Sequence, residues 1–258
     1  MYLIDTHTHF FDEAFNDDRR EAVERAIAAG VRKMVLPCCS PKSLDGIRNL
    51  VESFPENMFP TAGLHPEDID EFPQNQIDTI FSYSFSKPIV AIGEIGIDLH
   101  YMKDTLEIQQ KIFDLQIQKS IEMNLPVIIH CREAYNEVFD ILDRYNGKVR
   151  GIFHCFSGGE DIVEKILSYN TFYFGIGGVV TFKKSGLETA EMVKKIIPLE
   201  KIVLETDSPY IAPAPNRGKR NESSFILFVA HKIAELKQID VEQVINQTTI
   251  NAEQIFKI

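Results

Sequence analysis

Short apolar runs, many of them rich in β-branched residues, recur along the chain, and a polar or glycine-containing turn and an amphipathic stretch follow each one. Runs of this kind, bounded by turn residues, are typical of strands. They lie at residues 2–7, 33–39, 58–65, 89–97, 126–131, 149–156, 172–180 and 201–207. Consecutive runs are separated by the length of one helix with its loops, so the pattern predicts a regular alternation of strand and helix.

The stretches between these runs carry apolar residues at helical spacing. Helices are predicted most clearly at residues 15–29, 104–124, 222–236 and 240–256. The first of them closes on Gly30, and the second begins at Asp104, a suitable N-cap. The last two close the chain.

The predicted strands are apolar on both faces, which indicates a parallel sheet covered by helices. Eight strand–helix units in a chain of 258 residues predict an α/β fold of the (β/α)8 TIM-barrel type. No linker or low-complexity segment divides the chain, so we expect a single domain over residues 1–258. A doubly wound open sheet is the alternative. The absence of a GxGxxG or GxxxxGK[ST] loop after the first strand disfavours it.

The composition is that of an ordinary soluble protein, with 44% hydrophobic and 25% charged residues. No apolar run approaches the ~20 residues that span a membrane, and no secretory signal is visible. The cysteines lack CxxC spacing, so we expect reduced, mostly packed thiols at Cys38, Cys39, Cys131 and Cys155, with Cys38 or Cys39 a lesser candidate to line a pocket. These features predict a cytoplasmic protein with no membrane contact and no obligate protein partner.

The chain is acidic, with 27 basic and 38 acidic residues and a net charge of −11. Such a protein does not coat nucleic acid non-specifically. A nucleic-acid substrate stays possible, because bound metal ions and a local basic loop can dominate the field inside a cleft.

Histidines and carboxylates gather at the carboxyl ends of the predicted strands. Six of the seven histidines fall at or next to a strand end. The residues at these ends are His7, His9, His65, Glu94, His130, His154, Glu205 and Asp207. In a barrel, these ends meet at the face where the βα loops form the active site. Buried ionisable groups that lie so close must be paired, neutralised or bound to a metal ion.

Neutral imidazoles and carboxylates are common ligands of divalent metal ions. We therefore expect a metal site formed by His7, His9, Glu94, His130, His154 and Asp207. The first two are two residues apart, so on a strand they point to the same face and can bind one ion together. Glu94 reaches the site from the opposite side of the barrel, where it could bridge two ions.

Asp207 lies nearer the mouth of the predicted barrel than Glu205. It suits a ligand that also accepts a proton from water, whereas the deeper Glu205 suits a partner of a ligand or a helper base. Each residue alone has a simpler interpretation: an exposed HxH pair, a core histidine at His130 or His154, or an interior ion pair at Glu94. Only their joint placement at one end of one barrel favours the metal site.

Seven stretches together resemble the TatD family of metal-dependent hydrolases, within the amidohydrolase-like barrels. They are DTHTHF (5–10), GLHPED (63–68), AIGEIGID (91–98), PVIIHCREA (126–134), IFHCFSGG (152–159), LETDSPY (204–210) and RGKRNE (217–222). They span nearly the whole chain in the order found in that family. The chain departs from the family pattern at Asn216, where an aromatic residue or histidine is common, and at Ser223, where proline is common.

The resemblance implies the same six metal ligands, and active-site positions for His65 and Glu205. It implies two divalent metal ions, with Zn, Mn or Mg as the candidates, and Asp207 as the general base. The family is usually described as deoxyribonucleases, so the implied reaction is hydrolysis of DNA phosphodiester bonds, at strand ends or in single strands. Expected phosphate contacts are Arg132, Arg217, Lys219 and Arg220. The alternative is the same chemistry on a small amide or ester.

Overall fold

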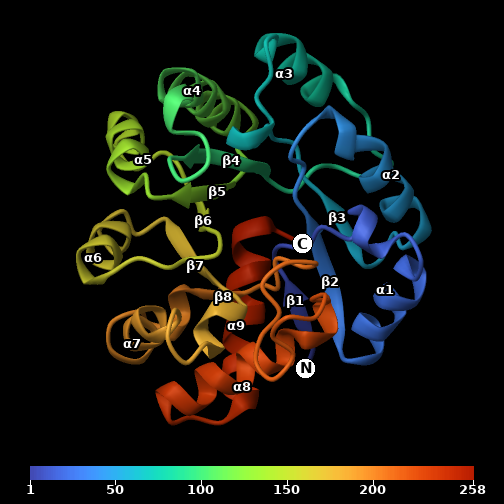
Figure 1. Ribbon diagram of the computed structural model, residues 1–258, viewed down its shortest axis with the longest axis vertical. Coiled ribbons are helices and arrows are strands. Elements are labelled where there is room, and N and C mark those ends of the chain that lie inside the picture. Colours follow the sequence, from blue (N-terminus) through green and yellow to red (C-terminus); the bar gives the residue numbers. More distant parts are fainter.

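The computed structural model describes all residues, 1–258, and Figure 1 shows its strands toward the middle with the helices around them. The strands are β1 Leu3–Asp5, β2 Val31–Leu36, β3 Met58–Pro60, β4 Ile92–Asp98, β5 Val127–Arg132, β6 Gly151–Phe153, β7 Phe172–Ile176 and β8 Ile202–Leu204. The helices are α1 Arg19–Ala28, α2 Leu44–Ser53, α3 Pro73–Ser82, α4 Leu106–Met123, α5 Tyr135–Leu142, α6 Glu160–Ser168, α7 Leu187–Lys195, α8 Ile226–Lys237 and α9 Val241–Phe256. Every strand is followed by a helix, and α9 is the one helix beyond this pattern.

All strands pair in parallel, in the orders β1-β2-β3 and β4-β5-β6-β7-β8. Backbone hydrogen bonds join the two sheets at both ends. Between β3 and β4, the Gly93 amide donates to the Ala62 carbonyl at 2.9 Å. Between β8 and β1, the Thr6 amide donates to the Leu204 carbonyl at 3.0 Å. The ring is therefore closed, and the predicted (β/α)8 barrel is confirmed.

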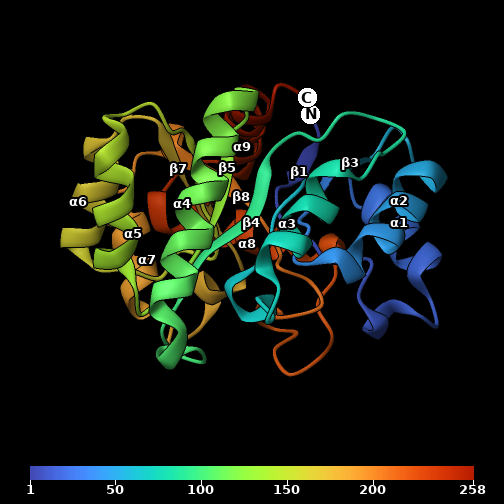
Figure 2. The same ribbon diagram turned by 90° about the horizontal axis from the view of Figure 1, so that it is seen from above.

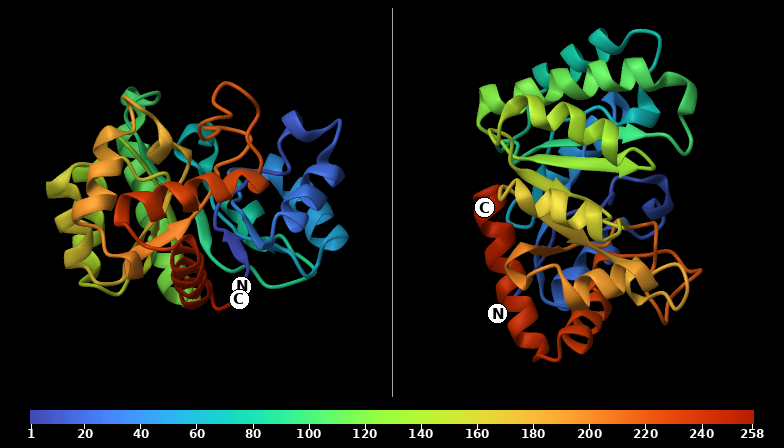
Figure 3. Two further views of the ribbon diagram at one scale, coloured as in Figure 1. Left: turned by 90° about the horizontal axis from the view of Figure 1, so that it is seen from below. Right: turned by 90° about the vertical axis from the view of Figure 1, so that its left-hand side faces the viewer.

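The amino-terminal half of the barrel interior is apolar. Its side chains include Ile4, Val35, Ile128, Ile152 and Val203. Helix α9 packs Ala252, Ile255 and Phe256 against the same cluster and covers this end of the barrel. Figures 2 and 3 show α9 on the side of the two termini, and the loop after β8 (orange) on the opposite side. The polar interior is thus confined to the carboxyl ends of the strands.

A second, larger core lies between the strands and the surrounding helices, and it includes Phe10, Phe113, Phe153 and Phe174.

None of the helices is long and apolar enough to cross a membrane. The four cysteines are free, as expected.

Most predicted strands extend beyond the observed ones. β7 ends at Ile176 because residues Gly178–Thr181 turn into a 3-10 helix, η6. β8 ends at Leu204, so Glu205 and Asp207 lie in the loop after it. The prediction of Asp104 as an N-cap was wrong, because a 3-10 turn occupies Lys103–Thr105 and α4 begins only after it.

Candidate metal centre

Six of the strand ends bring one cluster of imidazoles and carboxylates into the mouth of the barrel. β1 leads to His7 and His9, β3 to His65, and β6 to His154, while Glu94 and His130 lie within β4 and β5 and Asp207 follows β8. None of these side chains is more than 15% exposed. All six predicted ligands and His65 therefore meet in one place.

The Glu94 carboxylate lies at the centre of this cluster, and its two oxygens face different partners. Oε2 lies 3.1 Å from His7 Nε2. Oε1 lies 3.1 Å from His130 Nδ1, 3.2 Å from His154 Nε2 and 3.4 Å from His65 Nε2. The carboxylate therefore separates two groups of donor atoms and belongs to both.

The first group adds His9 and Asp207 to His7. The His9 Nε2 atom lies 3.1 Å from His7 Nε2 and 3.2 Å from Asp207 Oδ1, and His7 Nε2 lies 3.7 Å from the same oxygen. Ligands about 2.0–2.1 Å from a tetrahedral ion are about 3.4 Å from each other, so these separations fit a coordination shell. Two facing imidazole nitrogens can both direct lone pairs at a cation, whereas only one of them can donate a hydrogen to the other.

The second group is formed by His65, Glu94 and His130, whose donor atoms lie within 4.8 Å of one another, and His154 adds a nitrogen to it. Its geometry depends on glycine, because a side chain at Gly96 would place its Cβ 1.8 Å from the His130 carbonyl oxygen. Gly96 also has a φ of 151°, which favours glycine. The close approach of β4 and β5 thus positions Glu94 beside His130.

The charges in the cluster support one another. Burial alone would raise the pKa of Glu94, but the nearby imidazoles of His154, His7 and His65 hold it well below its usual range. Burial together with His154 lowers the pKa of His7, which favours the neutral imidazole that a metal ion requires. Burial opposes the protonation of His154, but the carboxylates of Glu94 and Glu205 raise its pKa well above the usual value, so a bound cation would take the place of its proton.

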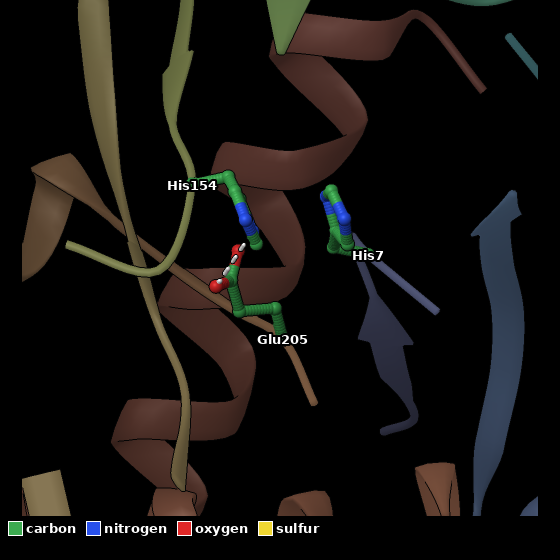
Figure 4. Close-up of side chains that lie close together, drawn as sticks. All are labelled: His7, His154 and Glu205. Carbon is green, nitrogen blue, oxygen red and sulfur yellow. Dashed lines mark ion pairs between the residues drawn. The ribbon is translucent and has the colours of Figure 1, made fainter. Parts of the chain in front are cut away.

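Glu205 lies beneath the ligands and is fully buried. Its Oε1 accepts a hydrogen bond from the Cys155 amide at 2.6 Å and lies 3.3 Å from His154 Nδ1 (Figure 4). Its Oε2, like Nδ1 of His7, has no hydrogen-bond partner although it is buried. Such unsatisfied polar atoms are expected where a bound ion or water completes the network. As predicted, Glu205 lies deeper than Asp207.

Asp207 is held by backbone contacts in a left-handed conformation with a φ of 56°. Its amide donates to the His7 carbonyl at 2.9 Å, and its carbonyl accepts from the Tyr210 amide at 2.9 Å. Burial opposes its ionisation, yet the hydrogen bond from His9 and the neighbouring imidazoles of His154 and His7 lower its pKa overall. The carboxylate is therefore ionised at neutral pH.

Two acidic residues that the sequence pattern did not single out contact the predicted ligands. Asp98, the last residue of β4, is fully buried and accepts a hydrogen bond from His130 Nε2 at 3.0 Å. Asp5 accepts from the Thr206 amide at 3.0 Å and from the His7 amide at 3.2 Å, which ties β1 to the strand-8 loop. Asp98 could have been found, because it is four residues after Glu94 and so points to the same face of the strand.

Cys39 also lies beside the ligands: its Sγ is 3.8 Å from His9 Nδ1 and 4.0 Å from Glu94 Oε2. This placement corresponds to the less favoured of the two interpretations of the Cys38–Cys39 pair. Burial and the charge of Glu94 raise the pKa of this thiol well above its usual value, so it stays protonated.

The four expected phosphate contacts lie in different surroundings. Arg132, Arg217 and Lys219 are exposed and form no ion pair with an acidic residue. Arg220 instead binds Asp18, with Nη1 2.5 Å from Oδ1 and Nη2 2.8 Å from Oδ2. Its guanidinium therefore holds the loop after β8 against the segment before α1. Because the guanidinium is paired in this way, we do not retain Arg220 among the phosphate contacts.

A (β/α)8 barrel with this cluster of histidines and carboxylates at its mouth is the arrangement of a metal-dependent hydrolase. Residues 4–257 match the family model described as TatD related DNase, and the chain belongs to this family. It is a metal-dependent hydrolase, and the resemblance seen in the seven sequence stretches is confirmed.

Relatives match over nearly their whole length. The metal-dependent hydrolase YabD of Bacillus subtilis is 37% identical over 257 residues, which cover 99% of this chain and 99% of that protein. The 3'-5' ssDNA/RNA exonuclease TatD of Citrobacter rodentium is 31% identical over 261 residues, with 99% and 98% covered. The crystal structure of YJJV, a TatD homologue from Escherichia coli K12, aligns with a TM-score of 0.89 at 27% identity, covering 99% of this chain and 98% of that one.

Proposed function

We propose that this chain uses two divalent metal ions to hydrolyse phosphodiester bonds in single-stranded DNA, working from a strand end. The observation that carries the proposal is the Glu94 carboxylate, whose two oxygens face two separate groups of donor atoms. Related chains named as single-strand exonucleases support the choice of substrate.

One ion would be held by His7, His9, Asp207 and Glu94 Oε2. The other would be held by His130, His154 and Glu94 Oε1, with His65 beside it. Zn or Mn suits such histidine-rich groups, and Mg is a candidate activating ion. When bound, ions of this kind polarise phosphoryl oxygens and make water nucleophilic at neutral pH.

The protein's own residues supply the proton transfer and the orientation. Asp207 is ionised, and its Oδ1 faces His9 while the carboxylate stays partly exposed at the mouth, so it can accept the proton of the attacking water. Glu205 orients His154 from below. Arg132, Arg217 and Lys219 are exposed and form no ion pair, so their N–H groups would be available to bind the phosphates of the strand.

The test is an end-labelled single-stranded oligodeoxynucleotide incubated with protein that has been stripped of metal and then supplied with Zn, Mn or Mg separately. We expect cleavage with at least one ion, and loss of cleavage in Asp207→Asn. A matched control is Asp143→Asn, which changes a carboxylate that binds Lys165 and Tyr169 on the outer surface. DNA that stays intact with every ion, while a small amide or ester is cleaved, would contradict the proposal.

A further inference from the structure

A cavity of about 550 Å³ opens between the loops that follow β7 and β8. One part of its wall is apolar and includes Val179, Phe182 and Ile211. Another part carries the positively charged Arg217 and Lys219. Its volume falls in the range of small-molecule sites, which are about 300–1,000 Å³.

The cavity lies next to the metal centre because the loop after β8 carries Asp207 and also lines the cavity, while the loop after β7 packs on Glu205. Ile211 follows Asp207 by four residues, and Val179 follows Gly177 by two. A side chain at Gly177 would place its Cβ 3.5 Å from Glu205 Cγ, so the backbone of this loop packs directly on that residue. The cavity and the metal centre therefore lie on the same face of the barrel, joined by the loop after β8.

The two loops are fastened to each other, so the cavity is formed in advance. The Ala214 amide donates a hydrogen bond to Thr181 Oγ1 at 2.8 Å. The loops also touch closely at Gly178, where a Cβ atom would come within 2.0 Å of the Ile211 carbonyl oxygen. Only glycine fits at this position.

Positive charge is concentrated around the cavity although the chain as a whole carries −11. The Arg217 guanidinium lies 4.3 Å from the centre of the Phe182 ring. Lys183 and Lys184 are the exposed residues between Phe182 and Ser185, which both line the cavity. Nucleobases stack on aromatic rings and on guanidinium planes, and phosphates bind unpaired Lys and Arg.

We propose that this cavity binds one nucleoside of the substrate strand, the nucleoside next to the phosphate that lies in the metal centre. The base packs on Phe182 and Arg217, and Lys219 meets the adjoining phosphate. This inference rests on the proposed nuclease function and names the part of the protein that recognises the strand. Because stacking is available to every base, the subsite tolerates all four bases.

The experiment compares Phe182→Ala with Phe182→Tyr, which keeps the aromatic ring. We expect Phe182→Ala to raise the KM for a single-stranded oligonucleotide about tenfold with little change in kcat, and Phe182→Tyr to restore it. Cleavage of an oligonucleotide whose residue next to the cleaved bond is abasic, and so offers no ring to stack, should have the same KM in both variants as in the wild type. An oligonucleotide with 2-aminopurine at the position next to the cleaved bond should lose fluorescence on binding to the wild type and not to Phe182→Ala.

A matched control exists at the other end of the same strands, where the Lys201 ammonium lies 5.2 Å from the centre of the Tyr173 ring. Lys201→Ala removes a positive charge over an aromatic ring and should leave the KM unchanged, whereas Arg217→Ala should raise it. Equal KM values in wild type and Phe182→Ala would overturn the inference while the nuclease function stands. A wild type that cleaves small diesters but no oligonucleotide would overturn both.

Discussion

Asp98 offers the sharpest test of how the protein positions its ligands. Its Oδ2 accepts from His130 Nε2 at 3.0 Å, and its Oδ1 accepts from the backbone amides of His100 and Tyr101 at 2.8 and 2.7 Å. A proton on Nε2 leaves the lone pair of the neutral ring on Nδ1, which lies 3.1 Å from Glu94 Oε1 and would bind an ion there. Both carboxylate oxygens of Asp98 must therefore be acceptors.

The substitution Asp98→Asn keeps the shape of the side chain and removes one acceptor. Its amide NH2 must face either two backbone N–H groups, which is repulsive, or His130 Nε2. In the second arrangement the imidazole proton of His130 moves to Nδ1, and Nδ1 can then no longer bind a metal ion. Removing a carboxylate partner of a metal-bound histidine typically lowers metal affinity 10–100-fold, or by about 1.4–2.7 kcal/mol.

The assay is a titration of metal-free protein with Zn or Mn against a chromophoric chelator, which resolves the two expected sites by affinity. We expect one of the two affinities to fall in Asp98→Asn and the other to stay. The Asp143→Asn variant, far from the centre, should bind as the wild type does. Two unchanged affinities in a folded Asp98→Asn protein would refute the role that we assign to this carboxylate.

Three further results are expected. Asp5→Ala should lower the free energy of unfolding, measured by urea denaturation, by about 2–6 kcal/mol, because the buried amides of His7 and Thr206 lose their acceptor. Asp5→Asn keeps an acceptor oxygen and should retain most of the stability. Phe256→Ala should lower the free energy of unfolding by about 3–5 kcal/mol, because the buried Phe256 ring of α9 covers the amino-terminal end of the barrel. Thermal unfolding would measure the change. In the folded protein Asp18 accepts hydrogen bonds from the guanidinium groups of Arg220 and Arg25. These bonds, with Arg220 contributing the larger effect, lower the pKa of the Asp18 carboxyl below its value in the unfolded chain. The stability it contributes is present above about pH 4 and is lost on further acidification, so Asp18→Asn should flatten the acid side of a stability–pH profile; a parallel profile would argue against it.

The sequence by itself determined the barrel and the set of histidines and carboxylates that meet at its mouth. Eight apolar runs alternating with helices leave few arrangements other than a closed parallel ring, and the carboxyl ends of parallel strands must meet at one face. His7, Glu94, His130 and Asp207 lie at such ends, so their convergence follows from the order of the strands. Local periodicity also decides which neighbours share a face, as for His7 and His9.

The tertiary structure decided everything that depends on the paths of loops. Arg220 and Asp18 are 202 residues apart, and only the folded strand-8 loop shows that they bind each other. The basic stretch RGKR therefore divides into a structural arginine, Arg220, and the exposed pair Arg217 and Lys219 beside Phe182. Loops have no repeating geometry that links spacing to direction, so their contacts cannot be read from the chain.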